Sequence, residues 1–433
     1  MKANPSEPMA AAAPATAPLP ELSPAQIRQA RGPEDQQCDG AGENRRRDNP
    51  VSEEELLWLW LCSCPGLYRN AVTALLHYFG SVKEIFQAPV SALAPWKKTG
   101  SKSSLQWVSS LAAHKESGSP ERMAELLRRK EISFVSCRHP DFPPSLRDLP
   151  DYPYGLFYRG HLPDPGRASV AVIGARCCSN YGYQMAGLIS RMLTEQGCQI
   201  ISGMAVGIDG AAQSACLQNG GSSYAVLGCG ADICYPPEHI RLFRSLPEHG
   251  GVLSEFAPGT PPLRNHFPIR NRLISGLSDA VVVVEAREKS GSLITADLAL
   301  EQGKDVYAVP GRCSDQLSRG CNRLIEQGAG IILSPDNLLD NLAVSIGLKR
   351  VRPDGKDGRR AAAESLPALS DEEQAVFNVL SSDAAGAEEI AAKASLPLVR
   401  TLQILVQLQL KNCAAEISRN RYAVILKGNA DLF

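Results

Sequence analysis

The sequence lacks the patterns that mark a zinc protein, a secreted protein or a membrane protein. Its 13 cysteines include no CxxC pair, and neither Cys62/Cys64 nor Cys177/Cys178 has the spacing of zinc ligands, so we predict reduced, mostly buried thiols and no metal. The N-terminus has no apolar core of the kind that signal peptides carry, and runs such as Val281–Val284 are too short to cross a bilayer. These absences predict a cytoplasmic protein without a membrane segment.

An excess of charge of either sign is also missing. Lys plus Arg number 45 against 46 Asp plus Glu, which gives a net charge of −1. The total therefore argues neither for nor against nucleic acid, and any basic surface must be local. The hydrophobic content of 44% is ordinary, and 433 residues are enough for two to four domains.

The N-terminal part of the chain divides into three segments. Residues 1–50 are poor in aromatics and rich in Ala and Pro, which is typical of a disordered tail. Residues 51–115 have helical periodicity and a Pro-Gly turn, like sterile-alpha-motif and helix-hairpin-helix modules. The turn at Gly66 lacks a second glycine for close backbone approach, which favours a packing or partner role over a DNA clamp. Residues 116–167 form a connector with one predicted helix (PERMAELLRRKE), one predicted strand (SFVSC) and a proline-dense end, and we expect it to pack on the next domain.

The remainder divides into two domains and a linker. Residues 168–348 alternate strands with helices, which predicts an α/β fold with an open, doubly wound, mostly parallel sheet of the Rossmann-like type. Residues 349–365 form a basic linker. Residues 366–430 read as three helices and a β-hairpin, the order of a winged helix. Its third helix, Pro397–Leu410, offers only Arg400 and glutamines, so a duplex-DNA contact and a protein contact are both open.

One βαβ unit organises the α/β domain. The β-branched run Asp279–Ala286 predicts a strand buried on both faces, and Asp305–Gly311 predicts a second. Between them, Ser290–Ser292 precede a helical pattern that stops at Gly303. Such a crossover places the serine/glycine turn at the C-terminal edge of the sheet, where free N–H groups of the helix start favour an anion.

Three more turns follow predicted parallel strands, so all four gather at one edge of the sheet, where α/β proteins bind ligands. The candidate phosphate-binding residues in these turns and just before the last strand are Gly174, Arg176, Gly203, Gly207, Tyr235, Pro236, Arg270, Arg272, Ser290, Gly291 and Ser292. Asp209 is interpreted as a helix N-cap, and Glu285 as ordering the Lys289–Ser292 turn rather than as an acid or base. Neither a catalytic triad nor a dinucleotide fingerprint is recognisable.

Together these stretches resemble one known family. VIGARCCSNYG, ISGMAVGIDGAAQ, LGCGADICYP, HFPIRNRLISGLSDAVVVVEA, SGSLITADLALEQGKDVYAVPG and SRGCNRLIEQGA, spanning residues 168 to about 335, are similar to motifs of the DNA-processing protein A (DprA or Smf) family. The flanking connector and winged helix look like the family as well. The pairing of FPIRNRLISGLS with SGSLITA is the most specific part of this resemblance.

The resemblance implies a single-stranded-DNA-binding protein of natural transformation. It implies no enzyme and no cofactor, a homodimer formed through the Rossmann-like domain, RecA recombinase as the partner that is loaded, and single-strand-binding protein as a further partner. The family's DNA-contacting arginine corresponds to Arg176, and its tyrosine–proline loop to Tyr235 and Pro236. Its two RNR arginines correspond to Arg270 and Arg272, and its serine/glycine turn to Ser290–Ser292. Ala175 and His239 depart from the serine and asparagine of the family pattern.

Two alternatives remain open from the residues. Nucleotide phosphoribohydrolases have the same type of domain, but their proline–glycine–glycine motif has no counterpart here, where the corresponding turn is Ser290–Ser292. A nucleotide sensor on the same fold is the other alternative.

Overall fold

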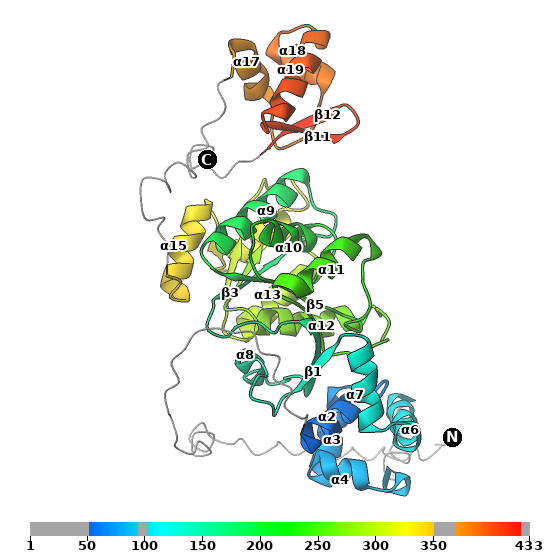
Figure 1. Cartoon of the computed structure of the whole chain (residues 1–433). Helices are drawn as coiled ribbons and strands as arrows, with labels where there is room; N and C mark the ends of the chain where they lie inside the picture. Colours follow the sequence, from blue (N-terminus) through cyan, green and yellow to red (C-terminus); the bar gives the residue numbers. More distant parts are fainter. Residues whose placement is uncertain (1–51, 94–101, 350–368, 426–433) are drawn as a thin grey trace, which may run out of the picture. The chain divides into compact units, whose positions relative to one another are not determined.

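A computed structural model of the chain describes residues 52–93, 102–349 and 369–425 (Figure 1). The predicted tail and nearly all of the predicted basic linker lie outside these described residues.

Helices make up the first domain, as predicted. They are α2 (Glu53–Cys62), α3 (Arg69–Phe79), α4 (Val82–Gln87), the 3₁₀ turn η1 (Val90–Leu93) and α6 (Lys102–Ser117), and α7 (Pro120–Arg129) follows in the predicted connector. The α2 helix begins where the sequence predicts it, because the Ser52 side chain accepts a hydrogen bond from the Glu55 N–H and three glutamates occupy its first turn. An unbroken run from Leu57 to Leu61 is buried, so α2 is the central helix of this domain.

The turn at Gly66 packs against other parts of the protein. Arg69 donates to the backbone oxygens of Pro150 (2.8 Å) and Tyr152 (3.0 Å). The Tyr68 hydroxyl lies 3.2 Å from Nε2 of His266, at the start of α12 (His266–Gly276). These contacts fit the packing role that the sequence favours for this turn.

The described residues form a nine-stranded sheet in the order β1-β2-β6-β5-β4-β3-β7-β8-β9. The strands are β1 (Ser133–Ser136), β2 (Gly155–Gly160), β3 (Ser169–Ile173), β4 (Gln199–Ser202), β5 (Ser223–Val226), β6 (Gly251–Ser254), β7 (Ala280–Val283), β8 (Asp305–Ala308) and β9 (Gly330–Ile331). From β6 to β9 all neighbours are parallel, whereas β1 and β2 are antiparallel additions at one edge. In the α/β domain the strands β3 to β9 alternate with helices along the chain, as the sequence predicts.

Helices cover both faces of the sheet (Figure 1). Val170, Val172 and Val282 belong to one buried cluster with residues of α9 (Asn180–Glu195), α10 (Ile208–Gln218) and α15 (Pro335–Ser345). Alternate residues of the same strands belong to a second cluster with residues of α12, α13 (Gly291–Glu301) and α14 (Arg319–Glu326). Successive residues of a strand point to opposite faces, so each apolar run supplies buried residues to both sides of the sheet, as the sequence predicts.

Two features of the sheet domain differ from the expectation. The predicted connector does more than pack, because its strands join the sheet: β1 is the strand predicted at SFVSC, whereas β2 and the short helix α8 (Pro144–Arg147) were not predicted. The helices α11 (Ile240–His249) and α12 were not predicted, since each contains a proline, Pro247 or Pro268. Pro268 lies in the first turn of α12, where the missing N–H has no intrahelical acceptor to lose.

The C-terminal domain has the predicted winged-helix order. Its elements are α17 (Asp371–Val379), β10 (Ala385–Gly386), α18 (Ala387–Ala394), α19 (Leu398–Leu410), β11 (Ala414–Ser418) and β12 (Arg421–Val424). The short 3₁₀ helix η2 (Pro237–His239) belongs to the sheet domain, where it precedes α11. A capping box between Ser370 and Glu373 begins α17. Val376, Ile390, Ile404 and neighbouring residues form a separate hydrophobic core.

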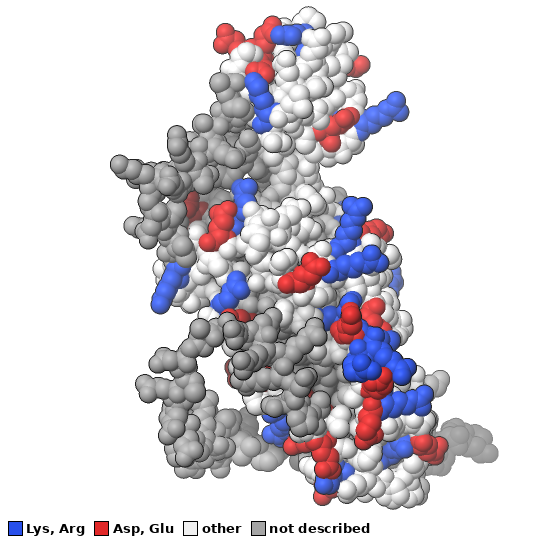
Figure 2. Space-filling model, in the orientation of Figure 1, with Lys and Arg blue, Asp and Glu red and all other residues white. Residues whose placement is uncertain are grey.

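Observations on the described residues and on the charge of the chain bear on function. Within the described ranges, no helix is long and apolar enough to span a bilayer. The same residues contain no cluster of His, Cys, Asp or Glu able to hold a metal ion, and all described cysteines are free thiols. Figure 2 shows acidic and basic side chains interspersed over the visible face, in keeping with the net charge of −1.

Candidate nucleic-acid interface

The edge formed by the C-terminal ends of β3 and β7 is where the strand order reverses. From β3 the sheet runs through β4, β5 and β6 on one side and through β7, β8 and β9 on the other. The loops after β3 and β7 therefore part and leave a crevice, the usual ligand position in such sheets. A cavity of about 740 Å³ lies here, bordered by the loops after β3, β4 and β7, by Tyr235 and by the start of α12. We call it the switch-point groove.

Positive charge dominates the lining of the switch-point groove. Its charged lining residues are Arg176, Arg264, Arg270, Arg287, Lys289 and Asp209. All the cations except Arg270 are exposed, whereas Asp209 is buried. The groove therefore presents several uncompensated cations to solvent, although the whole chain is nearly neutral.

The serine/glycine turn begins α13 as predicted. Ser290 is the N-cap, and its side chain accepts a hydrogen bond from the Ser292 N–H. Gly291 is exposed with open space above its Cα, and its carbonyl accepts a hydrogen bond from Asn271 of α12 (3.2 Å). Asn271 thus fixes the turn so that the positive end of the α13 dipole faces the groove.

An aromatic residue that sequence reasoning missed lies among the arginines. The Phe267 ring centroid is 5.3 Å from the guanidinium carbon of Arg176 and 5.9 Å from that of Arg270. The exposed Tyr235 ring lies 5.5 Å from the same ring. These distances allow cation–π attraction, which would orient Arg176 toward the groove. The phenylalanine beside the RNR motif, in FPIRNR, was the available signal.

Arg270 ties together the loops around the groove. It donates to the carbonyl of Gly203 (3.0 Å) and to that of Val226 at the end of β5. The Asp209 carboxylate accepts from the Gly203 N–H (3.0 Å). A Cβ at position 203 would lie 2.7 Å from Arg270 Nη2 and 2.8 Å from Asp209 Oδ2, so a larger residue here would displace one of these two side chains.

Burial shifts the pKa values of both Asp209 and Arg270. It raises the pKa of Asp209, a shift that the Arg270 charge opposes, and it lowers the pKa of Arg270 to about 10.

The expectation that Asp209 is an N-cap is wrong, because the N-cap of α10 is Gly207 and Asp209 lies inside the helix. At Gly207, where φ is +83°, a side chain would overlap the carbonyl oxygens of Ala175 and Arg176.

Arg272 lies away from the groove. Its Nε is 2.9 Å from an Asp151 oxygen, and its Nη2 is 2.6 Å from a Glu255 oxygen. Burial raises the pKa of Glu255, which the Arg272 charge opposes. This network links α12 to β6 and to the connector. A DNA contact by Arg272 stays a prediction, and we regard its role as holding α12 in place.

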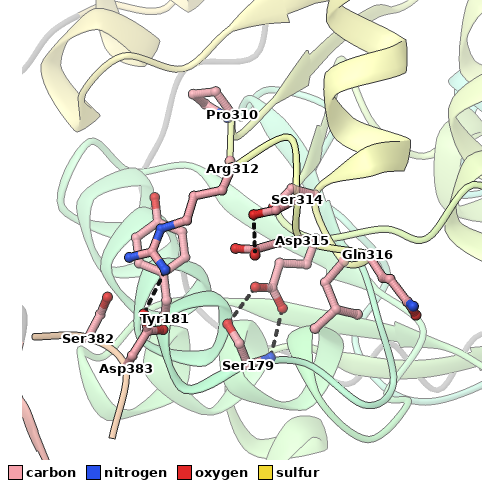
Figure 3. A pocket seen from close by; sticks show the side chains of 13 residues that line it. Ser179, Tyr181, Pro310, Arg312, Ser314, Asp315, Gln316, Ser382 and Asp383 are labelled. Carbon is pink, nitrogen blue, oxygen red and sulfur yellow. Dashed lines mark hydrogen bonds and ion pairs between the residues drawn. The ribbon is translucent and has the colours of Figure 1, made fainter. Parts of the chain in front are cut away.

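Glu285 has a different structural partner from the one expected. Its carboxylate accepts from the Ser179 N–H (2.8 Å) and Ser179 Oγ (2.5 Å), so it orders the loop after β3 (Figure 3). The interpretation that it orders the Lys289–Ser292 turn is wrong. Ser179 is in turn the N-cap of α9, which fixes the loop that carries Arg176.

The groove brings together most of the residues that the sequence singled out. Those that line it are Gly174, Arg176, Tyr235, Arg270, Ser290, Gly291 and Ser292. Gly203, Gly207, Pro236 and Arg272 do not line it. Gly203 and Gly207 shape it through close packing, and His239 contacts the Met204 carbonyl at 3.0 Å from the adjacent loop. Arg264, Phe267, Asn271, Arg287 and Lys289 are lining residues outside the predicted set.

Comparisons with known proteins agree with this arrangement. Residues 133–343 match the family model described as DNA recombination-mediator protein A, and residues 360–417 match the DprA winged helix domain. The Smf protein of Synechocystis sp. is 35% identical over 296 residues, which are 67% of this chain and 73% of that protein. The DNA processing protein DprA of Streptococcus pneumoniae is 45% identical over 198 residues, 46% of this chain and 70% of that protein.

A solved structure extends the similarity to the fold. The X-ray structure of DprA from S. pneumoniae has a TM-score of 0.55 and 33% sequence identity, and it covers 67% of this chain and 98% of that one. Two family models, relatives matched over more than two thirds of their length and this shared fold lead to one conclusion: the chain belongs to the DNA processing protein A (DprA) family.

Proposed function

We propose that the switch-point groove binds the phosphate backbone of single-stranded DNA and that the protein processes DNA in natural transformation. The observation that carries the proposal is the charge of the groove, which has five cationic side chains and one carboxylate that is buried beside Arg270. A chain of phosphates gains most from several exposed cations, and the N-terminus of α13 adds a further anion-binding element.

The spread of the cations favours a strand over a single nucleotide. Arg176 follows β3, Arg264 precedes α12, and Arg287 and Lys289 follow β7, so the charges come from three separate segments. The Tyr235 and Phe267 rings provide flat apolar surfaces between them, suited to stacking with bases of any sequence. Binding of this kind depends on the backbone and reads little of the base sequence.

The carboxylates near the groove favour binding over N-glycoside hydrolysis. Hydrolysis needs a carboxylate that is free to act on a substrate or a water molecule. Glu285 is held by two hydrogen bonds from Ser179, and Asp209 is buried beside Arg270. We therefore favour a binding protein over a phosphoribohydrolase-like enzyme or a nucleotide sensor.

The partners follow from this proposal. We propose that the protein acts as a homodimer through the sheet domain and transfers the strand to RecA recombinase, displacing single-strand-binding protein. The curated relatives carry DNA-processing names, and the matching family model is described as a recombination mediator.

An anisotropy titration with labelled single- and double-stranded oligonucleotides tests the binding proposal. Four exposed groove cations predict a slope of log K against log salt of about −3 on single strands, with little dependence on base sequence. A flat salt response, or strong preference for one base sequence, would contradict the groove as the binding site.

A second assay separates the recombination role from hydrolysis. The protein should stimulate RecA-driven pairing on DNA coated with single-strand-binding protein and should release no base from nucleoside monophosphates. Base release that disappears in Glu285→Gln would show that the site is catalytic, and pairing that is not stimulated would remove RecA from the proposal.

A further inference from the structure

The third helix of the winged-helix domain exposes an apolar stripe. Val399, Val406 and Leu410 of α19 are 71%, 52% and 81% exposed. Their spacing of seven and four residues puts them on one side of the helix, with Gln403 between them. The opposite side, including Ile404, Leu405 and Leu408, is completely buried in the core of the domain. The helix is therefore apolar on both sides, although only one of them packs within the domain.

The charge around this stripe is unsuited to DNA. The described residues 369–425 contain seven acidic and five basic side chains, a net charge of −2. Arg400, the cation of α19, lies 2.6 Å from Glu372, and Lys411 lies 2.7 Å from Glu373. A phosphate contact through α19 would have to break the Arg400 pair and approach an acidic domain. The electrostatics thus favour a protein at this face.

We propose that the apolar stripe of α19 pairs with the same stripe of a second copy of this chain. The stripe is self-complementary, because its apolar residues and Gln403 carry no charge and two copies would meet no like charge there. In an antiparallel pair related by a two-fold axis, Leu410 of each copy faces Val399 of the other. The Gln403 amides, which both donate and accept, lie near the centre of such a pair. This contact is separate from the groove and does not require DNA.

The size of the stripe sets the strength of the contact. Three exposed side chains with their neighbours bury less than the ~1,200 Å² of a stable interface, so two winged helices alone would associate weakly. The same contact becomes strong when two chains are already held together, since the second contact is then intramolecular. The stripe therefore serves to connect copies that are gathered by another interaction.

Site-specific photo-crosslinking of the full-length chain tests this pairing. A photoreactive benzoylphenylalanine replaces Leu410, and isotope-labelled and unlabelled chains are mixed at about 100 µM because the isolated contact is weak. We expect adducts between labelled and unlabelled chains that map to Val399–Gln403 of the other copy. The double variant Val399→Lys/Val406→Lys should lower their yield by about tenfold, since it removes the apolar partner of Leu410 and brings like charges of the two copies close together near the two-fold axis.

Val344→Lys provides the matched control. Val344 on α15 is 89% exposed and lies outside the winged helix, so this variant should leave the adduct yield unchanged. Adducts confined to one chain, including its own residues 426–433, would overturn the pairing. So would adducts to duplex DNA added in a parallel arm, or a yield that the double lysine variant does not change.

Discussion

Two parts of the protein lie where their folds commonly bind a ligand or partner, the switch-point groove of the sheet and helix α19 of the winged helix, and they differ in how their charges are compensated. The switch-point groove exposes four cations, and its one carboxylate is buried beside Arg270. The α19 face has one cation, Arg400, which is paired with Glu372. Both parts contain arginine residues. From this difference we expect phosphate binding to depend on cations without a partner rather than on the number of cations.

Packing produces this difference. In the groove, Arg270 is buried and neutralises Asp209 internally, so the exposed cations have no acid beside them in the lining. In the winged helix, surface acids pair with surface bases, as in Lys393–Glu389 and Arg400–Glu372. Exposed pairs of this kind contribute little stability. They do remove the free charge that a phosphate would need.

The largest effect is expected from Arg270→Met. The variant leaves Asp209 buried without its counter-charge, which should lower the free energy of unfolding by about 3–5 kcal/mol. Chemical denaturation measures this loss. The double variant Arg270→Met/Asp209→Asn keeps an acceptor for the Gly203 N–H and should regain more than half of it. Equal losses in the single and double variants would show that Arg270 acts by packing alone.

The stability of the Arg270→Met variant should depend on pH. Burial raises the pKa of Asp209 above its ordinary value, and loss of Arg270 should raise this pKa further. A raised folded-state pKa gives stability that is present below the unfolded pKa and lost as the pH rises through the folded pKa. The deficit of Arg270→Met relative to wild type should therefore shrink at acid pH, when denaturation is measured at about pH 5 and about pH 8.

The next prediction applies the same charge reversal, arginine to glutamate, to both regions. Arg176→Glu should weaken single-stranded DNA binding by about 1–3 kcal/mol, because it replaces a charged phosphate contact with repulsion. Arg400→Glu should change the affinity by less than about twofold, since that guanidinium is already paired. Titration of both variants, each with a normal melting curve, makes the comparison. Equal losses would mean that the winged helix contacts the strand.

A smaller effect than that of Arg176→Glu is expected from removal of the winged helix. A chain ending at Ser345 keeps the whole lining of the groove and the sheet, so its affinity for a single strand should fall by no more than a few-fold. Anisotropy measures the affinity, and circular dichroism confirms that the shortened chain is folded. A folded fragment that loses binding completely would place the DNA site in the winged helix.

Local patterns predicted much of the fold. The β-branched run around Val281–Val284 predicted β7, and Ser290 followed by a helical pattern predicted the start of α13. The proline in α12 concealed that helix, although a proline in a first turn does not interrupt it. Strand β2 was missed because the proline-dense segment around it reads as a loop, and its pairing with β6 is a long-range contact.

The candidate site was predicted in part. Gly174, Arg176 and the serine/glycine turn meet as expected, because parallel strands bring their C-terminal ends to one edge. Arg270 and Arg272 are two residues apart in the sequence but have different surroundings. Arg270 is beside the groove with Asp209, whereas Arg272 pairs with Asp151 and Glu255. Residues i and i+2 of a helix point in directions about 200° apart, so one motif supplies two separate functions.

By itself, the sequence determined the order of the domains, the parallel sheet and the edge at which its loops collect. These properties follow from periodicity and from the types of residue in each turn, which are local. Only the tertiary structure decided which charges face solvent without a partner. The partners of Arg270, Arg272, Glu285 and Arg400 come from residues 17 to 121 positions away, and no local pattern records them. Compensation of charge is a property of packing, and it separates the groove from the α19 face.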